Sequence, residues 1–214
     1  MTITSTPQRS TTAIEDPSPG RKVLVGLAAV YLVVFVAMMA TGADRSADDD
    51  PAKLIADYDI SDLGIQLMTY GTVVAAGALV FLGAALRSIV RRTAPRWTAD
   101  AAMLGFVVMA LTLVGFAMTA LALHHAVDIG DTTVVRAINV LDTTNFPLAM
   151  LALVCAMVGT GASALRTGAI PTWLCWASIA LGVMAPLGPL GFAPFMLFPL
   201  WVVVVTATIR LDKA

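Results

Sequence analysis

Two adjacent histidines, His124 and His125, are the first candidates for chemistry in this chain, and two aspartates follow them at Asp128 and Asp131. Imidazole and carboxylate groups bind divalent metals, and a spacing of four residues would place His124 and Asp128 on one face of a helix. A metal site needs three or four converging ligands, whereas adjacent residues on a helix point about 100° apart. We therefore interpret the histidines as a polar helix end with ordinary pH-sensitive contacts, and expect no metal and no cofactor.

A second candidate is a row of polar residues spaced by three along a predicted helix. The row consists of Arg136, Asn139, Asp142 and Asn145. Ionisable groups near hydrocarbon are costly and mark functional sites by default. The alternative is that the row lies above the hydrocarbon and orients a bend at Pro147, and we favour this because Asp142 lies at the edge of the nearest apolar stretch.

The amino-acid composition indicates whether these residues belong to a soluble protein or to a membrane protein. The chain has 214 residues, of which 58% are hydrophobic and 13% charged, with a mean hydropathy of +0.86. This composition excludes a soluble globular domain, a disordered protein and a nucleic-acid binder with a basic surface. Two cysteines, Cys155 and Cys175, exclude a disulfide framework. The expected partner is therefore the lipid bilayer, with no nucleic acid.

The uncharged stretches predict an all-α polytopic membrane protein, a bundle of six transmembrane helices with short external amphipathic helices. A stretch of about 20 apolar residues spans the hydrocarbon core. The last stretch, 167–209, has 43 residues without a formal charge and must turn back once, at the breaker cluster between Pro186 and Gly191. The predicted spans are 23–43, 63–86, 101–123, 146–165, 171–186 and 192–209.

The segments outside these spans are predicted to differ in structure. Residues 1–20 are rich in Ser, Thr and Pro and are expected to form a disordered tail, and 211–214 a short second tail. A first amphipathic helix is predicted after Pro51. A second is predicted from 131 to 144, with Asp131 as its N-cap, lying in the membrane interface before the chain enters the bilayer at Pro147.

Charge sidedness orients the six spans. One side holds ten basic and four acidic residues, including both termini, and the other holds three basic and ten acidic residues. Because Lys and Arg are retained in cytoplasmic loops, both termini are predicted to be cytoplasmic.

The interiors of the predicted spans hold no Lys, Arg, Asp, Glu or His at midplane depth. This pattern argues against a proton pump, a charge-coupled carrier or a buried acid–base enzyme. We expect a non-enzymatic membrane bundle of transporter-like, ligand-binding or accessory type. Its external crevice is predicted to be lined by Tyr70, His124, His125, Arg136 and Asp142. The alternative is an intramembrane enzyme that uses His125 and Asp142 as an acid–base pair at the external interface.

The run RTGAIPTWLCW at 166–176 resembles a segment of uncharacterised bacterial six-helix integral membrane proteins. The acidic PAKLIADYD after the first span and the basic RSIVRR after the second are similar too. The resemblance covers residues 23–210 and implies a multi-pass topology in a bacterial plasma membrane. The resemblance assigns no activity. Besides the lipid bilayer, the partners to be expected of such a bundle are a second copy of the chain or another membrane protein.

Overall fold

The computed structural model describes residues 20–41, 50, 52–53, 55, 61–91 and 95–210. In this part of the chain every regular element is helical. The helices are α1 (Arg21–Thr41), α3 (Asp62–Val90), α4 (Arg96–Ile129), α5 (Thr132–Thr144), α6 (Phe146–Leu153), the π-helix η1 (Val154–Val158), α7 (Gly159–Thr167), α8 (Thr172–Met184), the 3₁₀-helix η2 (Gly188–Gly191) and α9 (Phe192–Thr208). The two predicted tails and most of the first amphipathic helix lie outside the described residues.

The all-α polytopic bundle is confirmed. Within the described residues, five helical stretches are long and apolar enough to cross a membrane: Arg21–Ala40, Leu63–Val90, Arg96–Ile129, Thr132–Thr167 and Gly188–Thr208. The helix expected at 171–186 is shorter, because α8 has 13 residues and extends about 20 Å. The breaker cluster ends it early, and Gly188 adopts the left-handed region with φ +62°.

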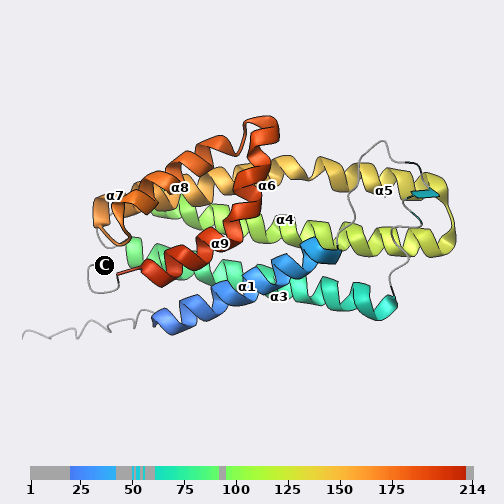
Figure 1. Ribbon diagram of the computed structural model, residues 1–214, viewed down its shortest axis with the longest axis horizontal. Helices are drawn as coiled ribbons and strands as arrows, with labels where there is room; N and C mark the ends of the chain where they lie inside the picture. Colours follow the sequence, from blue (N-terminus) through green and yellow to red (C-terminus); the bar gives the residue numbers. More distant parts are fainter. Residues whose placement is uncertain are drawn as a thin grey trace, which may run out of the picture.

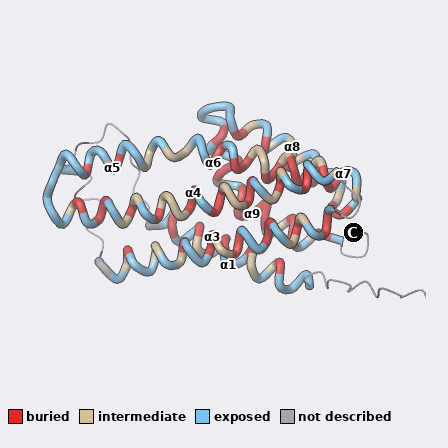
Figure 2. The backbone as a smooth tube through the Cα atoms, turned by 180° about the vertical axis from the view of Figure 1, so that it is seen from behind, coloured by how far each residue is buried: buried red, intermediate tan, exposed pale blue. Residues whose placement is uncertain are grey.

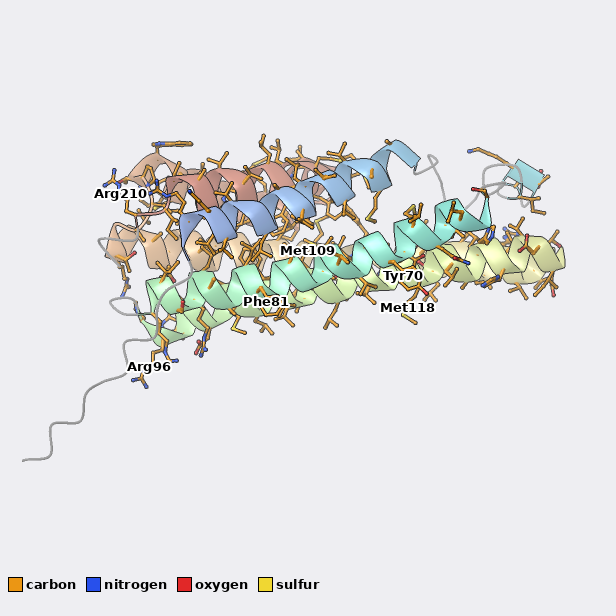
Figure 3. The ribbon with its side chains drawn as sticks, turned by 90° about the horizontal axis from the view of Figure 1, so that it is seen from below. Tyr70, Phe81, Arg96, Met109, Met118 and Arg210 are labelled. Atoms are coloured by element: carbon orange, nitrogen blue, oxygen red, sulfur yellow. The ribbon has the colours of Figure 1, made fainter. Side chains whose placement is uncertain are left out.

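The start of α1, the end of α9 and the turn between α7 and α8 meet at one end of the bundle. Arg21 donates a hydrogen bond to the carbonyl of Ile209 at 2.7 Å, and the Arg210 amide donates to the carbonyl of Ala169 at 2.8 Å. Figure 3 shows Arg96 and Arg210 at this end, with Tyr70 and Met118 toward the other. We call the first the basic end and the second the distal end.

The distal end is built from fewer helices than the basic end. At 34 residues, α4 is about 51 Å long, while a hydrocarbon core is about 30 Å thick. Beyond the turn between α8 and α9, the far parts of α4 and α5 continue as a hairpin (Figure 1). Buried residues are concentrated where the helices of the basic half pack together, and the hairpin is mostly exposed (Figure 2).

Helix α5 forms at the predicted position, but it packs along α4. The carboxylate of Asp131 accepts from the amides of Thr133 and Val134 at 2.9 and 3.2 Å, which confirms it as the N-cap. Val135 is fully buried in a small cluster with Leu123 and Ala126 of α4. The apolar face of α5 was expected to be buried in the membrane interface. In the structure it is instead covered by the far part of α4, which extends beyond the rest of the bundle (Figure 1).

Candidate functional site

A cavity of about 400 Å³ lies in the distal half of the bundle, where α1 ends and α3 and α9 begin. Helices α4, α5 and α6 contribute the rest of its lining, and the cavity is partly open. Its walls consist of Phe35, Met38, Met39, Met68, Leu113, Phe116, Ala120, Asp142, Thr143, Phe146, Phe192, Phe195 and Met196. We call it the distal cavity. Its volume lies in the range of pockets that hold small organic ligands.

Aromatic rings form one wall of the distal cavity. Phe195 of α9 packs against Phe35 with ring centroids 5.5 Å apart and against Phe146 with centroids 5.4 Å apart, both in edge-to-face geometry. Phe146 also lies 6.2 Å from the ring of Phe192. These contacts fix α1, α6 and α9 relative to one another, because offset and edge-to-face pairs are the favoured aromatic arrangements.

Four methionines complete the apolar lining of the distal cavity. They are Met38, Met39, Met68 and Met196. The thioether side chain is unbranched and polarisable and adapts to irregular shapes, so Met-rich walls accommodate ligands of differing outline. The hydroxyl of Thr72 lies 3.3 Å from the sulfur of Met38, which holds that side chain at the inner edge of the wall.

Asp142 brings a carboxylate into this apolar lining. The hydroxyl of Thr119 on α4 donates a hydrogen bond to its Oδ1. One turn further along α5, Asn145 lies against Gly115, where an added Cβ would stand 2.9 Å from the side-chain amide nitrogen. Asn139 is fully buried in the same row. The row beyond Arg136 therefore faces α4, and Gly115 of α4 allows this close approach.

The other predicted crevice residues are not among those that line the distal cavity. Tyr70 is 70% exposed on α3, and His125 is exposed on α4. His124 is buried, with Nε2 3.9 Å from Asp128 Oδ2 one turn away. Arg136 is exposed and lines a separate shallow depression on α5 with Thr132 and Thr133. Of the five predicted residues, Asp142 is the one that the structure places in the cavity wall.

The distance between His125 and Asp142 decides whether they can act as the predicted acid–base pair. Asp142 lies level with Thr119, and His125 is six residues further along the same helix, an axial distance of about 9 Å. A general base needs to lie about 3 Å from the proton it removes, or to reach it through one water. With His125 exposed and Asp142 in the cavity wall, this geometry does not favour a direct pair. Among the described residues, no three His, Cys, Asp or Glu side chains converge as a metal site.

Sequence reasoning missed the phenylalanines and methionines of the distal cavity. Phe195 and Met196 follow Phe192 at spacings of three and four, which places the three residues on one face of α9. That spacing was visible in the sequence, but an apolar stripe on a transmembrane helix equally describes a face that contacts lipid or a neighbouring helix. Only the arrangement of six helices around one volume shows that this face of α9 lines a cavity.

An apolar groove of about 650 Å³ adjoins the distal cavity between α6 and the turn after α8. It is lined by Phe146, Pro147, Met150, Leu151, Val154, Ala185, Pro186 and Gly188. Phe146 lines both the groove and the cavity. Its helix begins after an interruption at Asn145, where Pro147 has no amide hydrogen to donate. Phe146, next to a helix interruption, is thus common to the linings of the two spaces.

Comparison of the chain with known protein families, with curated proteins and with solved structures gives no match to a family model, a curated relative or a solved fold.

Proposed function

We propose that this protein is a multi-pass membrane protein that binds a small apolar ligand in the distal cavity. The observation that carries the proposal is a concave, partly open volume of about 400 Å³ walled by phenylalanines and methionines from five separate segments. Such a concave apolar pocket with few polar groups is the usual form of a small-molecule site. Binding without catalysis is favoured, because His125 of α4 lies about 9 Å along the helix axis from Thr119, the residue of α4 that contacts Asp142 of α5.

We further propose that the basic end faces the cytoplasm of a bacterial plasma membrane, and that the chain belongs with the uncharacterised six-helix proteins it resembles. The charges near the basic end support this orientation: Arg87 forms an ion pair with Asp100 at 2.5 Å, while Arg91, Arg96, Arg166 and Arg210 add positive charge. Positive residues beside spans are retained in the cytoplasm.

Cysteine labelling tests the orientation. In a background with Cys155→Ala and Cys175→Ala, Thr132→Cys on the distal hairpin should react with a membrane-impermeant maleimide on intact cells. Ala214→Cys, four residues after Arg210, should react only after the cells are lysed. The reverse pattern would place the basic end outside and contradict the orientation.

Filling the cavity tests ligand binding. We expect the neutral fluorescent probe N-phenyl-1-naphthylamine to bind the protein in lipid nanodiscs above the level of empty nanodiscs. Ala120→Trp places a large ring in the cavity wall and should raise the Kd of the probe by about tenfold or more, since it removes volume and apolar contacts.

The matched control is Ala84→Trp, which adds the same ring to an exposed position of α3. This variant should leave the Kd within about twofold of the unmodified protein, a change below about 0.5 kcal/mol. Equal effects of the two tryptophans, or no binding above empty nanodiscs, would show that the distal cavity is not a ligand site.

A further inference from the structure

We infer that the turn between α7 and α8 binds the headgroup of an anionic phospholipid, with Arg166 and Arg210 contacting the phosphate. This site goes beyond the proposed function, since it lies at the basic end and not at the distal cavity. The amide of Arg210 donates to the carbonyl of Ala169, which lies in this turn (Figure 1). Because Arg166 precedes Ala169 by three residues, the turn brings together two arginines that are far apart in the sequence.

The positive charge of this turn is not neutralised within the described part of the chain. Arg166 and Arg210 are exposed, and neither forms an ion pair with another described residue. The guanidinium of Arg21 adds a third positive charge beside them, because it donates to the carbonyl of the residue before Arg210. Asp100, the one acidic residue described at this end, is paired with Arg87. The turn therefore presents an electropositive surface that suits an anion.

Two tryptophans indicate that the turn lies at the membrane surface. Trp173 and Trp176 are 63% and 60% exposed, and both belong to the end of α8 that follows the turn. Indole rings favour the headgroup region of a bilayer, where the ring meets hydrocarbon and the N–H meets polar groups. The arginines of the turn are therefore at the depth of the lipid phosphates.

An exposed apolar face of α8 continues from the tryptophans into the bilayer. It consists of Trp173, Trp176, Ala180 and Val183, at helical spacings of three and four. From the first to the last of these residues the helix rises about 15 Å, which is half of a hydrocarbon core of about 30 Å. The face thus has the length of one leaflet, and the acyl tails of a lipid bound at the turn would cover it.

The combination of arginines and an apolar face favours an anionic lipid over other ligands. Arginine binds phosphate through paired N–H donors, so two guanidinium groups beside one phosphodiester form a favourable arrangement. A soluble phosphate would contact the arginines but not the apolar face. A zwitterionic lipid would bring a cationic group toward the same turn, and we therefore expect phosphatidylglycerol to bind more tightly than phosphatidylcholine.

Lipid titration of the detergent-solubilised protein, followed by native mass spectrometry, tests the inference. Dioleoylphosphatidylglycerol should bind about tenfold or more tightly than dioleoylphosphatidylcholine, which has the same tails. Arg166→Gln and Arg210→Gln should each weaken phosphatidylglycerol binding about fivefold, the effect of one basic residue near an anionic surface. The double variant should bind the two lipids about equally. Phosphatidylcholine binding should stay within about twofold in every variant, because neither change removes a side-chain hydrogen bond or ion pair among the described residues.

Arg96→Gln is the matched control, because it removes an exposed arginine from the same end of the bundle. Figure 3 shows Arg96 and Arg210 on opposite sides of that end. The control should leave phosphatidylglycerol binding within about twofold. Equal losses in Arg96→Gln and Arg210→Gln would show a diffuse response to positive charge and overturn the site at the turn.

Two other results would also overturn the inference. One is equal binding of the two lipids by the unmodified protein. The other is displacement of phosphatidylglycerol by glycerol 3-phosphate at a similar concentration, since the turn would then bind a soluble phosphate without any contribution from acyl tails. Neither result depends on the distal cavity, so the proposed function and this site fail or stand separately.

Discussion

Gly105→Ala is expected to lower the stability of the bundle strongly. A Cβ at Gly105 would stand 2.2 Å from the backbone nitrogen of Ala156 and 2.7 Å from the carbonyl oxygen of Ala152. Both are backbone atoms, so neither can rotate away, and α4 must separate from η1. In lipid, helices associate mainly through close packing, and this separation therefore removes the principal attraction between them.

The expected cost of Gly105→Ala is about 3 kcal/mol, the upper part of the range for overpacking a close-packed interior. Thermal unfolding of the detergent-solubilised protein should show a Tm lowered by several degrees, since about 1 kcal/mol shifts the Tm of a chain of this size by about 2–4 °C. Size-exclusion chromatography should show a smaller monodisperse fraction.

Gly77→Ala is the matched control for Gly105→Ala. It adds the same methyl group to a glycine within α3, where a Cβ would meet nothing within 4 Å. Alanine favours helix over glycine by about 0.5–1 kcal/mol, so this variant should be unchanged or slightly more stable. If Gly105→Ala were as stable as Gly77→Ala, the result would contradict the close packing of α4 against η1.

The bundle could be predicted from the sequence because lipid imposes a simple rule on the chain. Each spanning segment must satisfy its own backbone hydrogen bonds, so uncharged stretches of span length become helices. The 43-residue stretch from 167 to 209 had to turn, and the prolines and glycines between Pro186 and Gly191 supplied the breakers near its middle. The N-cap at Asp131 was equally local, since a carboxylate just before a helix satisfies its free amides.

The features that sequence reasoning missed depend on contacts between distant segments. The π-turn at Val154–Val158 has no local sequence signal, yet it lies where Gly105 and Gly182 allow neighbouring helices to approach. The packing of α5 along α4 was missed for a similar reason. An amphipathic helix satisfies its apolar face equally well against an interface or against an extended neighbour, and only the length of α4 decides between them.

The candidate site was likewise predicted only in the part that local sequence reveals. Asp142 was predicted because a charged residue at the edge of an apolar stretch can be recognised from the sequence alone. The grouping of Asp142 with Tyr70, His124, His125 and Arg136 assumed that residues at one membrane face share one crevice. The structure instead places Asp142 in a cavity wall that it shares with apolar residues of α1, α3 and α9.

Trp201→Ala is expected to produce the second large loss of stability. The indole is 4% exposed and stacks against Phe198 with ring centroids 5.4 Å apart and against Phe106 with centroids 6.2 Å apart. Its N–H donates to the Ser178 hydroxyl at 2.8 Å, and this hydroxyl donates in turn to the carbonyl of Leu174 at 2.6 Å. These contacts explain why this tryptophan lies inside a helix instead of at the interface, where tryptophan is usually favoured.

Removing the whole indole should cost about 3–5 kcal/mol, the range for truncating a large buried aromatic side chain. Trp201→Phe keeps an aromatic ring between Phe106 and Phe198 but removes the donor to Ser178, so it should cost about 1–2 kcal/mol. Ser178→Ala in the Trp201→Phe background should then add little, because the two groups form one hydrogen bond. Thermal unfolding of the single and double variants measures these differences. Full additivity of Trp201→Phe and Ser178→Ala would show that the hydrogen bond does not hold α8 to α9, and that packing of the rings alone accounts for the position of Trp201.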